Sequence, residues 1–231
     1  MEFRPTGFNL MPPVVKNLLI INALMFFATI VLGKYNIDLS EHLALYHWSS
    51  DKFRIWQFVT HLFMHGGNIN DPDGGFMHLF SNMFALWMFG AVLENNMGQK
   101  RFLTFYMLCG IGAALLYLLV ITYQLAQIPH SPQGMQMISF LRDQGCVGAS
   151  GAVFGILFAF GYLFPNTMLY IYFLFPVKAK YFIAFYALFE LYAGIKNNPG
   201  DNVAHFAHIG GMLVAFIILK IWNKTNKQNF I

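Results

Sequence analysis

Four polar side chains have the types and positions that acyl-transfer chemistry requires. Ser150 lies in Gly148-Ala149-Ser150-Gly151, where a polar segment turns into an apolar one. A serine at a helix N-terminus faces free backbone N–H groups and the positive end of the helix dipole, which favour a developing oxyanion. Its hydroxyl needs a base, and the imidazole of His208 can take a proton near neutral pH. The pair predicts a serine nucleophile activated by a histidine.

His78 and Asn82 supply the other two side chains. They are spaced i and i+4, so they share one face of a helix. An imidazole and an amide directed at one point could donate to an oxyanion alongside the backbone N–H of Ser150. The alternative is a structural hydrogen bond between helices.

The small residues around Ser150 have a second interpretation. Taken alone, Gly148 to Gly155 is typical of a surface on which membrane helices pack closely. The spacing from Gly151 to Gly155 matches that from Gly211 to Ala215. Two such faces would let their helices approach, which predicts that packing brings Ser150 and His208 into hydrogen-bond reach.

Two further polar residues lie in apolar runs. His205 stands three residues before His208 and is expected simply to contact water near the start of its helix. Glu190 is expected either to pair with a histidine or tyrosine, or to stay protonated and hydrogen-bonded. The second interpretation is favoured because hydrocarbon disfavours the charged carboxylate.

No metal or other cofactor is expected. His61 and His65 are spaced i and i+4, but Leu62 follows His61, so the zinc-protease pattern HExxH is absent. No helix adds the carboxylates that a zinc or di-iron site would use. Cys109 and Cys146 lack a CxxC spacing and predict neither a disulfide framework nor a zinc site.

These residues belong to a very apolar chain. Of 231 residues, 57% are hydrophobic and only 10% are charged, and the mean hydropathy is +0.52. A soluble domain carries about 25% charged residues, so we expect an integral membrane protein, an all-α bundle in contact with lipid. The net charge of +4 comes without a basic run or stripe, which argues against a nucleic-acid partner.

Six apolar runs approach the roughly 20 residues that a membrane helix needs. The expected helices are residues 17–33, 76–93, 102–126, 150–164, 181–195 and 203–222, which together make one membrane domain of residues 17–222. Residues 1–16 form a polar lead without a cleavage site, so the first run is expected to be retained. Residues 223–231 form a basic tail.

The connecting segments differ in character. The second half of residues 34–75 is rich in aromatic residues beside charges and is expected to lie in the headgroup region, ending in a turn at residues 68–75. Residues 129–148 are expected to be a polar loop. Met168 to Val177 is an apolar run expected at the interface.

Basic residues predict the orientation of the six helices. On the side of the two termini lie Arg4, Lys16, Lys100, Arg101, Lys178, Lys180, Lys220, Lys224 and Lys227, against Lys34, Lys52, Arg54, Arg142 and Lys196 on the other. This bias favours cytoplasmic termini. The second, fourth and sixth helices then start at the outer face, which predicts that His78, Asn82, Ser150 and His208 share one shallow layer. Polar groups in such a layer are expected to be functional.

At these residues the sequence resembles the rhomboid family of intramembrane serine proteases, over essentially the whole chain. The family's GxSG motif matches Gly148 to Gly151, and its AHxxG motif matches Ala207 to Gly211. Its HxxxN motif matches His78 and Asn82, and its Gly…Leu-Glu ending matches Gly90 and Leu93-Glu94. The order and spacing make the match specific.

The resemblance implies a Ser150–His208 dyad without an acidic third member, and an oxyanion held by His78, Asn82 and the Ser150 N–H. It implies that Phe154 stacks on His208, and that Gly148, Gly151 and Gly211 support the site. Helix 181–195 and residues 197–202 would form the gate through which a substrate helix and water enter. The six-helix, bacterial-type pattern implies a bacterial inner membrane and transmembrane protein substrates. It leaves the oligomeric state open.

Two positions depart from the family pattern. The first loop often carries Trp-Arg where this chain has Trp56-Gln57, so other hydrogen bonds must hold that loop. The last helix usually has a glycine where this chain has Ala215. The alternative function is a catalytically inactive relative that binds or escorts membrane clients. Because such proteins lose the serine or the histidine and this chain has both, the protease is favoured.

Overall fold

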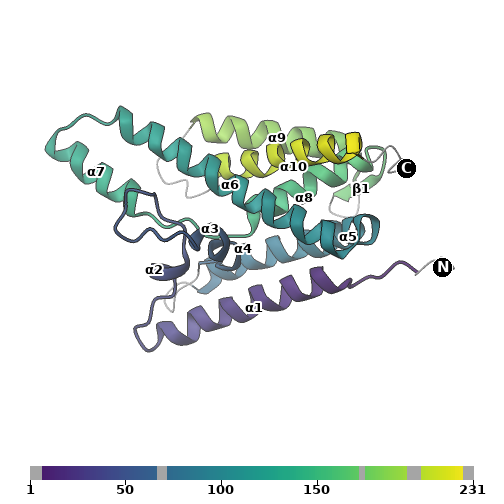
Figure 1. The fold of residues 1–231 in the computed structure, drawn as a ribbon, viewed down its shortest axis with the longest axis horizontal. Helices are drawn as coiled ribbons and strands as arrows, with labels where there is room; N and C mark the ends of the chain where they lie inside the picture. The colour runs from purple at the N-terminus through teal and green to yellow at the C-terminus, as the bar shows by residue number, and fades with distance from the viewer. Residues whose placement is uncertain (1–6, 67–71, 172–174, 197–203, 226–231) are drawn as a thin grey trace.

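The computed structural model describes residues 7–66, 72–171, 175–196 and 204–225. Helices occupy all six of the expected ranges (Figure 1). They are α1 (Pro13–Gly33), a composite of α4 (Pro72–Ala85), η2 (Leu86–Gly90) and α5 (Ala91–Met97), α6 (Gln99–Gln127), α8 (Ser150–Leu163), α9 (Ala179–Lys196) and α10 (His205–Thr225). Most are longer than expected, because polar residues at their ends remain helical.

Length and apolarity identify the membrane-spanning helices among them. In the described part of the chain, four segments are long and apolar enough to cross a membrane: Pro13–Gly33, Gly75–Met97, Gln99–Gln127 and His205–Asn223. Helix α8 is apolar but has only 14 residues. The chain is therefore a helical membrane protein with four candidate spans.

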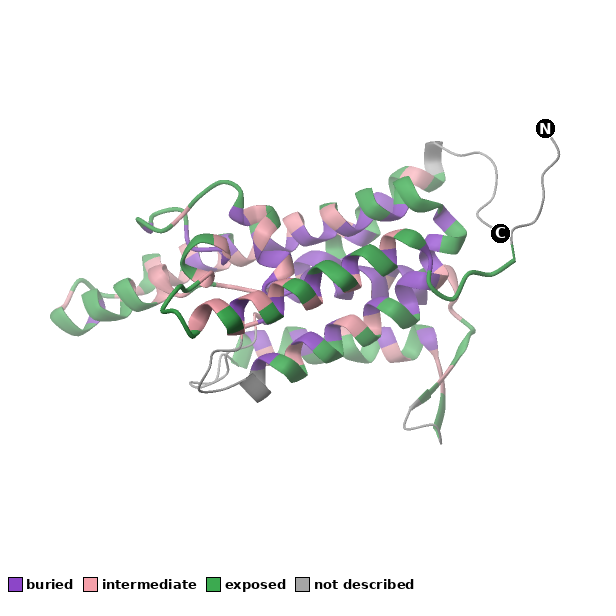
Figure 2. Ribbon diagram, turned by 90° about the horizontal axis from the view of Figure 1, so that it is seen from below, coloured by how far each residue is buried: buried purple, intermediate pink, exposed green. Residues whose placement is uncertain are grey.

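One expectation about the connections is wrong. Residues 129–148 contain α7 (Pro132–Asp143), an amphipathic helix that begins where the Ser131 side chain accepts a hydrogen bond from the Gly134 N–H at 3.1 Å. The strands β1 (Met168–Ile171) and β2 (Phe175–Lys178) pair antiparallel, so the expected all-α bundle carries one short two-stranded sheet. The interfacial position expected for Met168 to Val177 stays a prediction. Both elements project from the bundle and are largely exposed (Figure 2). The expected turn at residues 68–75 falls mainly outside the described residues.

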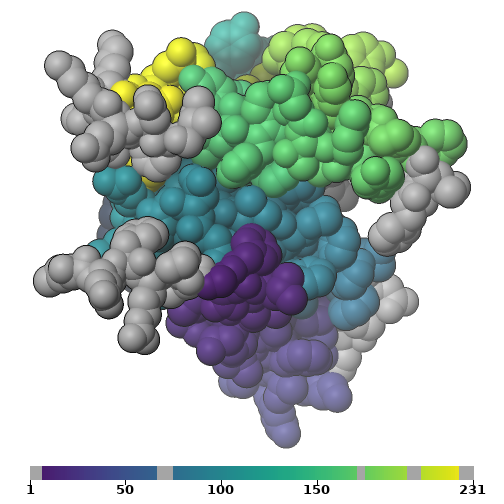
Figure 3. Space-filling view, turned by 90° about the vertical axis from the view of Figure 1, so that its right-hand side faces the viewer, coloured from purple at the N-terminus to yellow at the C-terminus, as the bar shows by residue number. Residues whose placement is uncertain are grey.

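The helices lie in three tiers. Helix α1 packs against α4 to α6, which separate it from α8, α9 and α10. The same order is visible from the end of the bundle, with α1 in purple at the bottom (Figure 3). Helix α8 is buried on almost every side, with Ala152, Ile156 and Ala159 inaccessible to solvent. Helices α4, α8 and α10 all begin at the end of the bundle that carries α7 (Figure 1).

In its described residues 34–66, the segment between α1 and α4 contains three short helices, and it packs against the same end of the bundle. These are α2 (Ser40–Leu43), α3 (Gln57–Thr60) and the 3-10 turn η1 (His61–Phe63). Gln57 is fully buried there. Its amide donates to the Lys52 carbonyl at 2.9 Å, and its oxygen accepts from the Arg54 N–H at 3.0 Å. Gln57 thus holds the turn where the family pattern has an arginine.

Helix α1 lacks a capping side chain of its own. It starts at Pro13 after Pro12, and its first free N–H groups would be costly to leave unpaired. The buried carboxylate of Glu94, on α5, accepts from the N–H groups of Val14 at 2.9 Å and Val15 at 2.8 Å. A side chain from another tier therefore fixes the start of α1.

Replacing Glu94 by glutamine is expected to destabilise the protein by about 1–3 kcal/mol, because the NH₂ group would face one of these buried N–H donors. Thermal unfolding in detergent measures the effect. Asn95→Ala is the matched control, since Asn95 also links α5 to the chain before α1 but is exposed, and we expect a much smaller shift. Equal shifts would contradict the capping role.

Candidate active site

Ser150 is the first residue of α8, and the loop before it is held from two sides. The Gly148 N–H donates to the His61 carbonyl at 2.9 Å, and the backbones of Cys146 and Leu45 form an antiparallel β-bridge. Gly148 has a φ of +129°, and a Cβ there would lie 2.8 Å from the His78 ring. A glycine is therefore needed both for the backbone conformation and for the approach of His78.

His208 lies on the first turn of α10 and reaches Ser150. Its Nε2 is 2.8 Å from the Ser150 Oγ, a hydrogen-bond distance. On one side of the imidazole lies Phe154, one turn along α8, with ring centroids 4.1 Å apart and planes 10° from parallel. The helix positions and the stacked ring together fix where the imidazole can point.

Glycines set the distance between α8 and α10. A Cβ on Gly211 would lie 1.8 Å from the Gly151 carbonyl oxygen, and one on Gly155 would lie 3.1 Å from the Gly211 oxygen. The two backbones are in direct contact at the predicted small-residue faces. Any side chain at Gly211 would separate the helices that carry Ser150 and His208.

The two candidate oxyanion donors differ in position. The His78 ring lies against Gly148, two residues before Ser150. Asn82 is buried, and its amide nitrogen donates to the His78 carbonyl of the same helix at 2.9 Å. That nitrogen keeps a second hydrogen, so an oxyanion role for Asn82 stays a prediction.

Glu190 and His205 differ from their sequence interpretations. Both are buried, so the expectation that His205 simply contacts water is wrong. The Glu190 Oε2 lies 2.7 Å from the His205 Nδ1 and 2.8 Å from the His208 Nδ1. Glu190 therefore pairs with histidines, which is the less favoured of its two interpretations. His208, the histidine that contacts Ser150, has an acidic neighbour that the family resemblance did not imply.

The sequence did contain a signal for this contact. Glu190 is the single acidic residue of α9, and a short connection joins α9 to α10, so the two helices must be neighbours.

Glu190, His205 and His208 have potential metal-ligand atoms within 4.8 Å of one another, and in the described part of the chain they are the group that could hold a metal ion. Each residue offers one such atom, a ring nitrogen of either histidine or a carboxylate oxygen of Glu190.

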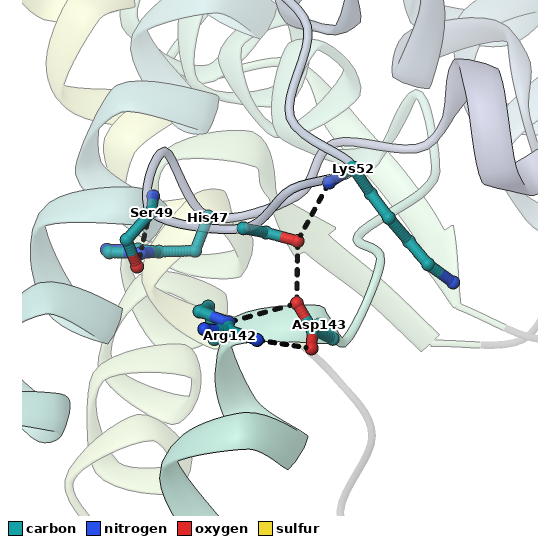
Figure 4. A network of polar contacts seen from close by, with 6 residues as sticks. His47, Ser49, Lys52, Arg142 and Asp143 are labelled. Carbon is teal, nitrogen blue, oxygen red and sulfur yellow. Dashed lines mark hydrogen bonds and ion pairs between the residues drawn. The ribbon is translucent and has the colours of Figure 1, made fainter.

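A second polar network ties α7 to the first loop (Figure 4). Asp143, at the end of α7, accepts from the Ser50 hydroxyl at 2.6 Å and from the Arg142 Nε at 3.1 Å. These bonds, that of Arg142 first, hold the pKa of Asp143 below its ordinary value. Nearby, the His47 Nε2 lies 2.9 Å from the Thr122 Oγ1 on α6. The network anchors the segment that leads to Ser150.

Acidification is expected to weaken this end of the molecule through His61. Burial lowers its pKa from 6.5 to about 4, and its Nδ1 donates to the Gln57 carbonyl at 2.7 Å. Between these pH values the unfolded chain binds a proton that the folded chain does not. The free energy of unfolding therefore falls as the pH drops from 6.5 towards 4, by up to about 1.4 kcal/mol per pH unit.

Thermal unfolding in detergent at pH 7, 6 and 5 measures this dependence. His61→Asn keeps a donor near the Gln57 carbonyl but cannot titrate in this range, so its unfolding temperature should fall less on acidification than that of the parent. Parallel curves for the two proteins would show that His61 does not contribute.

Comparison with known proteins decides the family. A model of the rhomboid domain matches residues 52–224, a range that includes Ser150, His208, His78 and Asn82. The chain belongs to the rhomboid family. The RHOMBOID-like protein 12, mitochondrial, of Arabidopsis thaliana is 30% identical over 220 residues, which are 94% of this chain and 60% of that protein.

Two other rhomboid relatives agree. The Rhomboid protein 1, mitochondrial, of Saccharomyces cerevisiae is 32% identical over 143 residues, covering 62% of this chain and 37% of the yeast protein. The Rhomboid-like protein 16, chloroplastic, of Arabidopsis thaliana is 27% identical over 223 residues, covering 94% and 63%. This rhomboid chain thus spans less than two thirds of the length of these relatives.

Proposed function

We propose that this rhomboid protein is an intramembrane serine endopeptidase that cleaves transmembrane substrates near the outer membrane face. The observation that carries the proposal is the 2.8 Å contact between the His208 Nε2 and the Ser150 Oγ at the N-terminus of α8. A hydroxyl beside an imidazole, at a helix end that presents free N–H groups, has the parts of an activated nucleophile and an oxyanion site.

In the proposed reaction the Ser150 Oγ attacks the scissile carbonyl carbon while its proton passes to the His208 Nε2. The Ser150 N–H, His78 and the second N–H of the Asn82 amide stabilise the oxyanion. His208 then gives the proton to the leaving amine, and an acyl group remains on Ser150. A water activated by His208 releases that acyl group. Phe154 keeps the imidazole in place throughout.

The dimensions of α8 support a site below the membrane surface. Its 14 residues make a helix about 21 Å long, which is shorter than the roughly 30 Å hydrocarbon core. With its far end near one surface, Ser150 would lie within the hydrocarbon layer. Water and substrate must therefore enter from the α7 end or between helices, and we propose α9 as the gate. Residues 197–202, the other part of the expected gate, lie outside the described residues.

We propose that the chain crosses the membrane six times, at the six expected ranges, with both ends of the chain in the cytoplasm and the α7 end outside, as the basic residues favour. A bacterial inner membrane is the proposed location. The proposed substrates are transmembrane helices whose outer ends unwind easily, with a small residue before the cleaved bond. The assignment of substrates rests on the family resemblance and on the position of Ser150.

Purified protein in lipid vesicles with a model transmembrane substrate tests the activity. We expect the parent to release a fragment cut near the outer end of the substrate helix, and Ser150→Ala to release none. Binding of the substrate without cleavage by either protein would instead favour a rhomboid relative that binds or escorts membrane clients. Equal cleavage by the two proteins would overturn the mechanism.

A further inference from the structure

Glu190, His205 and His208 form a buried cluster between α9 and α10. The three side chains are at most about a tenth exposed. One carboxylate oxygen, the Glu190 Oε2, lies within hydrogen-bond distance of two ring nitrogens, at 2.7 Å from the His205 Nδ1 and 2.8 Å from the His208 Nδ1. A carboxylate in an apolar helix is costly unless it is paired, and these contacts are its pairing.

The contact determines which nitrogen of His208 carries the proton. An ionised carboxylate only accepts hydrogen bonds, so the His208 Nδ1 must be the donor. In the neutral ring the Nε2 is then the acceptor, and this is the atom 2.8 Å from the Ser150 Oγ. In the opposite tautomer the Nε2 carries a hydrogen and therefore cannot accept the serine proton.

We propose that Glu190 is a positioning residue of the reaction, which holds His208 in the tautomer that acts as a base and stabilises its protonated form. The inference rests on the proposed function for its kinetic consequence. It replaces the two-residue arrangement implied by the family resemblance with a line of three groups, Glu190, His208 and Ser150. Glu190 touches neither substrate nor reacting atoms and acts through His208.

His205 has a different part in the cluster. Its Nδ1 binds the same oxygen at nearly the same distance, but it stands one turn before His208, and no described contact joins it to Ser150. We assign it to holding the Glu190 carboxylate in place. The two hydrogen bonds to Oε2 are therefore alike in geometry and unlike in consequence, which gives the test its matched control.

The first experiment compares Glu190→Gln with His205→Gln in the cleavage assay at pH 7. Glutamine at position 190 keeps the size of the side chain but removes the charge. Its NH₂ group can donate to the His208 Nδ1, which would favour the tautomer with a hydrogen on Nε2. We expect kcat to fall by between about 100-fold and 10⁴-fold with KM unchanged within twofold, the upper value being the loss caused by the analogous Asp-to-Asn change in a serine-protease triad. His205→Gln should lower kcat by less than about 10-fold.

A purely structural cluster predicts otherwise. Glu190→Gln perturbs both hydrogen bonds and His205→Gln only one, so in a purely structural cluster each variant would lose activity in proportion to its loss of thermal stability. A Glu190→Gln enzyme whose activity loss follows its stability loss as in His205→Gln, or one within twofold of the parent, would overturn the proposal. Glu190→Asp, which keeps the charge on a shorter side chain, should regain part of the activity.

The second experiment is independent of cleavage. Nitrogen-15 NMR of protein labelled in its histidine rings reports the tautomer of each imidazole, and the signal missing in His208→Gln identifies His208. We expect the Nδ1–H form in the parent and its loss in Glu190→Gln. The Nε2–H form in the parent would overturn the inference. If the parent shows Nδ1–H but cleaves no substrate, the proposed function fails while the assignment of the contact stands.

A third experiment distinguishes hydrogen bonding from metal binding, since Glu190, His205 and His208 could hold a metal ion. We expect cleavage to survive dialysis against a chelator and to fall when excess zinc is added, because zinc would compete for the His208 Nδ1. Loss of cleavage on chelation, with recovery when zinc is returned, would overturn the positioning role.

Discussion

Replacing Ser150 and His208 together by alanine is expected to lower cleavage no further than replacing either residue alone. Each single change should reduce kcat by about 10⁴-fold, because a nucleophile and its base act as a unit and their losses are not additive. The measurement is single-turnover cleavage of a transmembrane substrate in lipid vesicles by the parent, both single variants and the double variant.

Thr104→Ala is the control for loss of a hydroxyl, since Thr104 is exposed and its hydroxyl donates to the Lys100 carbonyl of its own helix at 2.9 Å. It should cleave like the parent. A double variant slower than both single variants by the product of their effects would mean that Ser150 and His208 act independently, and the 2.8 Å contact would then have no catalytic meaning.

Replacing Gly211 by alanine is expected to remove activity and to lower stability. The new Cβ would lie 1.8 Å from the Gly151 carbonyl oxygen, and because this atom belongs to the backbone of a buried helix, only a separation of α8 and α10 can relieve the overlap. A displacement of about 1 Å at a catalytic contact can cost about 100-fold in rate, and overpacking typically costs about 1–3 kcal/mol.

A pair of compensating changes tests the same interface. A Cβ on Gly151 would meet the Ala113 Cβ at 2.4 Å, so Gly151→Ala should impair cleavage and Ala113→Gly should partly restore it. The same second change should not rescue Gly211→Ala, whose obstacle is backbone. Gly33→Ala, which meets nothing within 4 Å, is the neutral control. Full activity in Gly211→Ala would contradict the proposed spacing of the helices.

Much of this fold is predictable because lipid imposes a simple rule. A segment that crosses hydrocarbon must be helical and apolar, so the apolar runs located the six helices, and the small residues at Gly151 and Gly211 indicated which two approach closely. The hairpin Met168–Lys178 and helix α7 escaped prediction. Both lie outside the long helices, where water can satisfy the backbone and hydropathy carries little information.

The geometry of the site was less predictable than its composition. The sequence places His208 and Glu190 on two neighbouring helices, but a hydrogen bond depends on the rotation of each helix about its axis. That rotation is set by packing against the neighbouring helices, as the contact of Gly211 with Gly151 does for α10. The apolar character of α9 is nearly uniform around its circumference, so periodicity could not say which way Glu190 faces. Packing decides it.

The central claim, that Ser150 is a nucleophile activated by His208, is tested most directly by covalent labelling. Membranes containing the protein would be treated with a fluorophosphonate, which reacts with activated serines, and the adduct located by mass spectrometry of peptides. We predict a single adduct on Ser150 in the parent and none in His208→Ala. An unlabelled parent, an adduct on another serine, or equal labelling of Ser150 without His208 would contradict the account.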